Sequence, residues 1–99
     1  MTTVSWTARA QADLAAIHAF IETDSPHFAK VVVRRLLQAI DRLQHFPQSG
    51  RSVPEYTDTD TSVREVILSP YRIVYRIVDE ETVHVLTVHH AARGDIAGL

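Results

Sequence analysis

The side chains that could do chemistry lie mostly in the second half of this 99-residue chain. They carry carboxylate, guanidinium and imidazole groups, which serve in acid–base reactions and in phosphate binding. Six of them are candidate site residues: Glu55, Arg64, Arg72, Arg76, His90 and Arg93. Metal-free cleavage of RNA needs a group that activates the 2′-hydroxyl, an acid for the leaving oxygen and cations for the phosphorane charge. The arginines could equally bind a partner without any bond being made or broken.

The arginines also have a purely structural interpretation. Arg64, Arg72 and Arg76 could pair across strands with Glu65 and with the acidic turn 79–81. An exposed pair contributes only about 0–1 kcal/mol, which gives little reason for so many arginines on one face. We therefore expect a function for Arg72 and leave both interpretations open for the other two. Arg93 could be a plain surface charge, although it follows closely after the two adjacent histidines.

Metal and cofactor sites are not expected. His89 and His90 are neighbours in a predicted strand and point to opposite faces, so they cannot easily share a metal. His84 has the strand parity of His90, but six residues of strand separate the two by about 20 Å. The chain has no cysteine, which excludes disulfides and thiolate zinc sites. Its three glycines cannot build a phosphate-cradling loop.

Length and composition indicate one small globular domain, residues 1–99, with 45% hydrophobic and 22% charged residues. A net charge of −2 and a pI near 6.3 argue against binding nucleic acid through bulk positive charge. A local basic patch remains open. No targeting signal is recognisable, and no apolar run approaches the roughly 18 residues of a membrane span, so we expect a cytoplasmic protein that does not enter the membrane.

Helical spacing dominates the first half. After a short strand at 3–6, Thr7 is expected to cap a helix that ends near Thr23. Ser25 and Pro26 start a second helix, which Pro47 should end at about Phe46. Apolar residues recur every three or four positions in both helices, as in helices that are half buried. The second helix also carries a basic cluster: Lys30, Arg34, Arg35 and Arg42.

Three β runs follow a polar, turn-rich stretch at 47–61. They cover 63–68, 71–78 and 82–89, and the short turns between them force antiparallel pairing. In the middle run one face carries only large apolar residues, and the other face carries two arginines, Arg72 and Arg76, on either side of Val74. We therefore predict an α+β fold of order β-α-α-β-β-β, in which a helical hairpin packs on one face of a small, mainly antiparallel sheet. The helices should cover the face with Ile73, Tyr75 and Ile77, and the two arginines should lie on the other.

Three segments, in this order, resemble the RelE/ParE superfamily of bacterial toxins from type II toxin–antitoxin pairs. They are Trp6 to Leu14, Phe46 to Arg51 and Val63 to Arg76. The ending Val88-His89-His90-Ala91-Ala92-Arg93 is similar to the ParE branch, which often closes its last strand with a histidine and a nearby arginine. The likeness covers nearly the whole chain.

This resemblance implies a cytoplasmic toxin that uses no cofactor and is held in a hetero-oligomer by a cognate antitoxin encoded beside it. The ParE branch poisons DNA gyrase without chemistry of its own, whereas the RelE branch cuts messenger RNA in the ribosomal A site. The tyrosine that RelE-type toxins place near the C-terminus is missing, since nothing aromatic follows Tyr75. We therefore expect a ParE-like gyrase inhibitor rather than an enzyme, with five target-binding residues: Arg64, Arg72, Arg76, His90 and Arg93.

The alternative is a RelE-like, ribosome-dependent and metal-independent endoribonuclease. A second pattern in the superfamily uses the glutamate of a Pro-Glu pair as base together with a terminal histidine. Glu55 and His90 align with that pattern, although Ala91 stands where the pattern has tyrosine. The catalytic residues would then be Glu55, Arg72 and His90. A third alternative is a member that still binds its antitoxin but has lost toxicity.

Overall fold

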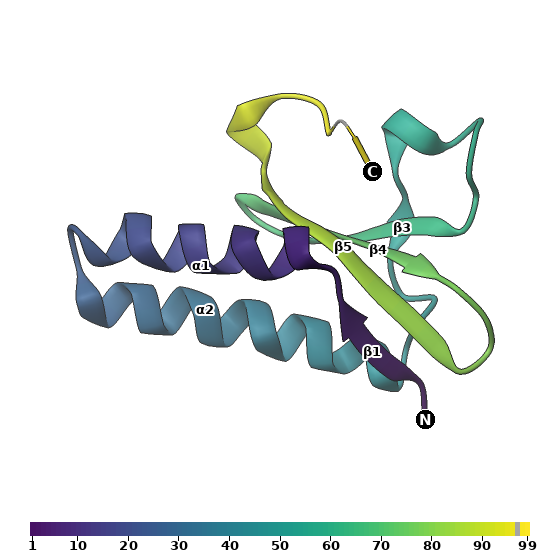
Figure 1. The fold of residues 1–99 in the computed structure, drawn as a ribbon, viewed down its shortest axis with the longest axis horizontal. Helices are drawn as coiled ribbons and strands as arrows, with labels where there is room; N and C mark the ends of the chain where they lie inside the picture. The colour runs from purple at the N-terminus through teal and green to yellow at the C-terminus, as the bar shows by residue number, and fades with distance from the viewer. Residues whose placement is uncertain (97) are drawn as a thin grey trace.

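The chain forms two layers, a helical hairpin and a five-stranded sheet (Figure 1). The computed structural model describes residues 1–96 and 98–99. The strands are β1 (Thr3–Trp6), β2 (Arg51–Ser52), β3 (Val63–Leu68), β4 (Tyr71–Ile77) and β5 (Thr82–His90). The α-helices are α1 (Ala8–Glu22) and α2 (Pro26–Asp41), and three short 3₁₀ helices are η1 (Arg42–Gln44), η2 (Pro54–Tyr56) and η3 (Ala91–Arg93).

Both helices begin where the sequence predicts. The Thr7 hydroxyl accepts a hydrogen bond from the Ala10 amide at 3.1 Å, and the Ser25 hydroxyl accepts one from Phe28 at the same distance. The end of the second helix differs from the prediction. Regular α-helix stops at Asp41, and the last turn tightens into η1 before the chain reaches Phe46. Such 3₁₀ tightening is common at the C-terminal ends of helices.

The strand order is β1-β5-β4-β3-β2, with β1 parallel to β5 and the other neighbours antiparallel. The predicted α+β arrangement is therefore confirmed. The sequence analysis missed β2, because two exposed residues in a polar loop carry no alternating pattern. One register shift interrupts β5, where Val74 faces Thr87 but Tyr75 faces Val85, so that Leu86 is an extra residue.

The sheet separates two sets of apolar side chains. On the helix-covered face, Ile73 packs with Leu36 and Ile40 of α2, and Tyr75 packs with Leu43. On the other face, Val74 packs with residues from the loop after β2, from the start of β3 and from the C-terminal end: Val53, Val63 and Ile96. We refer to this second side as the open face. The predicted facing of β4 is confirmed, because Val74 shares strand parity with Arg72 and Arg76.

Tyr75 fixes the loop that leads into β2. Its phenol donates to the Pro47 carbonyl at 2.7 Å and accepts from the Gly50 amide at 2.9 Å. Gly50 is required by space, since an added Cβ would lie 2.6 Å from the Tyr75 hydroxyl and 2.7 Å from the Glu65 carbonyl oxygen. Burial raises the pKa of the phenol above its usual value. The Phe46–Arg51 segment is therefore shaped by a side chain on β4.

Helix α1 covers the part of β5 that β1 does not reach. The β1 ladder ends at Val85, so the following backbone groups of β5 lack a strand partner on that side. Asp13 of α1 accepts hydrogen bonds there from the Val88 amide, at 3.1 Å, and from the Thr87 hydroxyl. The Thr7 hydroxyl donates to the Leu86 carbonyl at 2.9 Å. These contacts satisfy an edge that would otherwise be exposed.

Neither helix of the hairpin, nor any other helix among the described residues, has the length and hydropathy of a membrane span.

Candidate functional site: an arginine–carboxylate network

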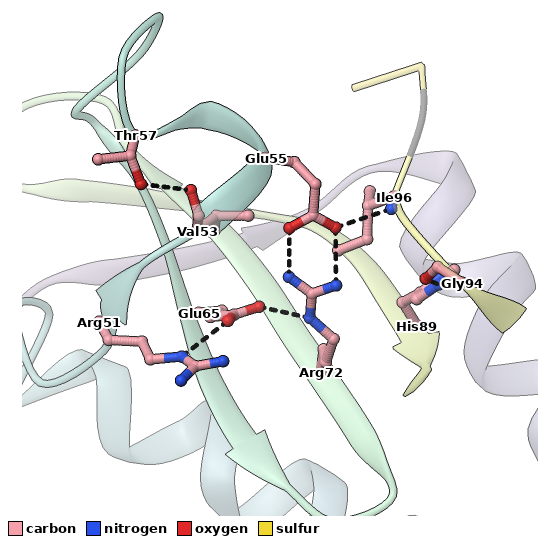
Figure 2. Close-up of polar contacts among 9 residues, drawn as sticks. All are labelled: Arg51, Val53, Glu55, Thr57, Glu65, Arg72, His89, Gly94 and Ile96. Carbon is pink, nitrogen blue, oxygen red and sulfur yellow. Dashed lines mark hydrogen bonds and ion pairs between the residues drawn. The ribbon is translucent and has the colours of Figure 1, made fainter. Parts of the chain in front are cut away.

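Polar side chains from four elements meet on the open face (Figure 2). Arg72 comes from β4, Glu65 from β3, Arg51 from β2 and Glu55 from η2. The strand pairing explains part of this meeting. Arg51 lies directly opposite Glu65 in the β2–β3 ladder, and side chains opposite each other share a face. Pro54 and the short turn of η2 then bring Glu55 back over the sheet.

The Arg72 guanidinium is held by two carboxylates at once. Its two terminal nitrogens donate to the two oxygens of Glu55 at 2.8 Å each, and Nε donates to Glu65 Oε1 at 2.7 Å. The other oxygen of Glu65 accepts from Arg51 Nε at 2.8 Å. The Glu65 side chain is fully buried, whereas those of Arg72 and Glu55 are 12% and 15% exposed. A bidentate contact in such a site is strong and fixes orientation.

Electrostatics keep Glu55 and Arg72 ionised. The hydrogen bonds from Arg72 lower the pKa of Glu55 from 4.5 to about 2, against the opposing effect of burial. In return, the hydrogen bonds to Glu55 raise the pKa of Arg72 above its already high value. At neutral pH Glu55 is therefore a carboxylate that is already occupied by a cation. It is poorly suited to accept a proton from a substrate hydroxyl.

The segment after β5, from η3 (Ala91–Arg93) to Ile96, closes over the same site, and we call it the C-terminal segment. The Ile96 amide donates to Glu55 Oε2 at 2.9 Å, and the Ile96 side chain is 4% exposed among the apolar residues of the open face. His89, which faces Arg72 across the β4–β5 ladder, forms a hydrogen bond from its Nε2 to the Gly94 carbonyl at 2.9 Å. Figure 2 shows this segment beside Glu55 and Arg72. The C-terminal segment therefore limits the access of a substrate to the Arg72 guanidinium.

A second ion pair lies farther along the open face. Arg76 Nη1 donates to Asp60 Oδ2 and, at 3.0 Å, to the Ser62 hydroxyl. Hydrogen bonds from Ser62 and from Arg76 lower the pKa of Asp60 to about 2. The open face therefore carries three arginines (Arg51, Arg72, Arg76) and three carboxylates (Glu55, Asp60, Glu65), which form one group of four residues and one separate pair. Three positive and three negative charges cancel, so this face is not a basic cleft.

The other predicted site residues lie elsewhere. Arg64 is opposite Tyr75 and therefore on the helix-covered side, where its Nη1 donates to the Gly50 carbonyl at 2.9 Å. His90 is opposite Tyr71 and is also on that side, with the two rings in an edge contact at 5.4 Å. Arg93 is exposed in η3 just beyond. The structure thus brings Glu55 and Arg72 together and leaves His90 on the opposite face.

The sequence analysis missed Arg51 as a member of the Arg72 network and Asp60 as the partner of Arg76. The signal for Asp60 was local, because an aspartate two residues before a serine favours a turn in which its carboxylate accepts the Ser62 amide, here at 3.0 Å. Arg51 gave no signal, since its role depends on a two-residue strand. The acidic turn 79–81 makes no ion pair with the candidate arginines within the described ranges. Likewise, no group of three or more His, Asp or Glu side chains there could hold a metal ion.

Comparison with known proteins identifies the family. The sequence model described as "ParE toxin of type II toxin-antitoxin system, parDE" matches residues 4–94. The chain belongs to the ParE toxin family. Toxin RelE2 of Caulobacter vibrioides is 40% identical to it over 93 residues, which are 94% of this chain and 99% of the relative.

Two solved structures share the ParE fold of this chain. The chromosomal ParDE toxin–antitoxin system from P. aeruginosa superposes with a TM-score of 0.72 at 24% identity, covering 91% of this chain and 96% of that one. The toxin–antitoxin complex RelBE2 from Mycobacterium tuberculosis superposes with a TM-score of 0.58 at 27% identity, covering 90% and 96%. The superfamily recognised from the sequence and its fold are thereby confirmed.

Proposed function

We propose that this ParE-family chain is a cytoplasmic toxin that inhibits DNA gyrase by binding it, without cleaving any bond itself. The occupied guanidinium of Arg72 carries this proposal. A ribonuclease needs that cation free to face a charged phosphorane, but here its donors are directed at Glu55 and Glu65. The position of His90 on the opposite face agrees, because a base and an acid must reach the same scissile phosphate.

The alternative function is ribosome-dependent cleavage of messenger RNA. One observation favours it: the relative from Caulobacter vibrioides carries the name Toxin RelE2. It requires the C-terminal segment to leave Glu55, the Arg72 ion pair to open, and an acid to be found on the open face. Two histidines, His89 opposite Arg72 and His84 opposite Arg76, are on that side of the sheet, and His89 is the one next to the Arg72 site.

We assign target binding chiefly to the end of β5. Arg93 is exposed and makes no ion pair within the described part of the chain, and His90 lies close to it in sequence and space. Arg64, Arg72 and Arg76 were expected to share this role. Their hydrogen bonds to carboxylates and backbone carbonyls support a mainly structural role for them instead.

The proposed partner in the resting state is a cognate antitoxin. Both structural neighbours are toxin–antitoxin systems, and this chain has apolar surface to cover. Phe20 and Phe28, at the tip of the helical hairpin, are 78% and 52% exposed and border a hollow that reaches Tyr71 and His90. Substituting Phe20 with Ser should weaken antitoxin binding about tenfold or more, since exposed aromatic anchors dominate such interfaces. Phe46→Ser, with a similarly exposed ring outside this hollow, is the control.

The test of the toxic activity uses purified toxin in two assays. We expect inhibition of gyrase supercoiling and no A-site cleavage of messenger RNA on programmed ribosomes. Arg93→Ala and His90→Ala should each weaken gyrase inhibition several-fold, while His89→Ala, the matched control for His90→Ala, should leave it unchanged. Cleavage on ribosomes that falls about 10²–10³-fold in Arg72→Ala, with gyrase unaffected, would contradict the proposal.

A further inference from the structure

The charges of this chain are divided unevenly between its two layers. The open face is neutral, as described above, whereas α2 and the short helix η1 that follows it together carry four cations, and the one acidic residue between Pro26 and Gln44 is Asp41 at the end of α2. The four are Lys30, Arg34, Arg35 and Arg42. All are exposed, and none of them takes part in an ion pair within the described ranges. A chain of net charge −2 thus concentrates unpaired positive charge on α2 and the turn that follows it.

Helical spacing puts these side chains on the outer surface of α2. Lys30, Arg34 and Gln38 follow one another at intervals of four, which places them in a row. Arg35 and Arg42, seven residues apart, form a second row beside it. The opposite side of the helix is buried through Ala29, Leu36 and Ile40, of which Leu36 and Ile40 pack with residues of the sheet. In Figure 1, α2 runs along the lower side of the molecule, with α1 between it and the C-terminal segment.

We propose that these two basic rows on α2 and η1 bind the phosphate backbone of duplex DNA without regard to sequence. From Lys30 to Arg42 the helix advances about 18 Å, at about 1.5 Å per residue. That length matches roughly five base pairs, because phosphates on one strand recur every 3.4 Å along the DNA axis. Arginine and lysine are the side chains that neutralise phosphates, and Gln38 adds a neutral donor of the kind found at such contacts.

The surface chemistry favours DNA over an acidic protein. A protein partner gains most of its affinity from apolar anchors that fill a pocket at the centre of the interface. The two rows themselves contain only cations and Gln38. One exposed apolar residue, Leu37, and the carboxylate of Asp41 border the first row, and Phe28 lies beyond the second row. Phosphate contacts need no apolar anchor. The proposal goes beyond gyrase inhibition and does not depend on it, since the binding is to DNA alone.

The experiment measures binding of the purified toxin to a fluorescent 20-base-pair duplex at several salt concentrations. Four phosphate contacts predict that log K falls with log[salt] with a slope of about −3.6, at 0.9 per contact. Arg34→Gln/Arg42→Gln should reduce the slope to about −1.8 and weaken binding at least about tenfold at 50 mM salt. Its control, Gln11→Glu/Gln48→Glu, changes the net charge by the same two units at exposed positions outside α2 and should keep the slope.

Several outcomes would overturn the proposal. These are no binding at 50 mM salt up to 1 mM toxin, a double variant with the slope of the unmodified toxin, or a control that loses as much slope as the variant. A 20-residue poly-glutamate peptide serves as a second probe, and tighter binding of this peptide than of the duplex would assign the surface to an acidic protein instead. Should the double variant melt earlier than its control, Lys30→Gln/Arg35→Gln provides the same charge change on the same helix. The gyrase assay is independent, so failure here leaves that proposal intact.

Discussion

Arg72 and His90 lie on opposite faces of the sheet, because Arg72 is opposite His89 in the β4–β5 ladder and His90 is opposite Tyr71. A shift of one residue in this ladder would have brought the imidazole of His90 to the guanidinium. Instead, each of the two belongs to a different surface. Arg72 is part of a neutral network under the C-terminal segment, and His90 borders the hollow at the tip of the helical hairpin.

The first prediction concerns what Arg72 contributes to stability. Arg72→Ala leaves the fully buried Glu65 with Arg51 alone and removes both hydrogen bonds to Glu55. We expect the free energy of unfolding to fall by about 3 kcal/mol, as when one partner of a buried pair is deleted. Arg76→Ala is the control, because that pair is about one-third exposed and should contribute only about 0–1 kcal/mol. Equal losses in urea denaturation would contradict this ranking.

The second prediction is that the free energy of unfolding falls at low pH because of Glu55. We call this fall the acid limb. Its pKa is about 2 in the folded chain against 4.5 ordinarily, so the unfolded chain binds more protons between these two values. The stability contributed by Glu55 is complete above about pH 4.5 and is lost as the pH falls through about 2. Urea midpoints measured from pH 6 to pH 2 should therefore fall, and Glu55→Gln should fall less steeply.

Part of this acid limb belongs to Asp60, whose pKa is also lowered to about 2. Some pH dependence of stability should therefore remain in Glu55→Gln and should decrease further in the double variant with Asp60→Asn. Asp58→Asn is the control, since Asp58 is exposed and makes no ion pair among the described residues. An acid limb of unchanged steepness in Glu55→Gln would show that the Arg72 contact does not hold its pKa down.

The third prediction tests the contact between Gly50 and Tyr75. Gly50→Ala would bring a methyl group within 2.6 Å of the Tyr75 hydroxyl and 2.7 Å of a backbone oxygen, so one of them must move. We expect a loss of about 1–3 kcal/mol, typical of overpacking. Tyr75→Phe should cost a similar amount, because the Gly50 amide and Pro47 carbonyl lose their partner. Gly50→Ala with an unchanged urea midpoint would show that the loop has room to shift.

Much of the fold could be predicted from local patterns. The caps Thr7 and Ser25 and the alternation around Arg72 are short-range signals, and they placed both helix starts, β3 and the facing of β4 correctly. The parallel pairing of β1 with β5 joins residues about 80 positions apart, and no local pattern reports it. No local pattern predicts the bulge at Leu86 either.

The site was harder to predict than the fold. Pairing of Arg72 with Glu65 was expected as one alternative, since both lie on adjacent predicted strands. The Glu55 contact depends on how the 47–61 loop folds back, and the cover from Ile96 depends on the path of the C-terminal segment. Neither path is encoded by a periodic pattern. As a result, the sequence found an arginine suited to function but not the carboxylates that occupy it.

The last prediction concerns the cover that the C-terminal segment gives to the open face. Ile96 is 4% exposed, packs with Val53, Val63 and Val74, and donates its amide to Glu55. Ile96→Ala should lower the free energy of unfolding by about 2 kcal/mol, at the low end for such a change because a chain end can relax into the space.

Ile67→Ala is the matched control, since this isoleucine lies in β3 and is 46% exposed. Its loss should stay below about 1 kcal/mol, because most of the side chain is already in contact with water. The two variants remove the same atoms, so the difference between their urea midpoints measures burial at the C-terminal end alone. Equal midpoints would mean that the segment is not held on the open face, and Glu55 and Arg72 would then be accessible to a substrate. That result would favour the ribonuclease alternative over gyrase binding.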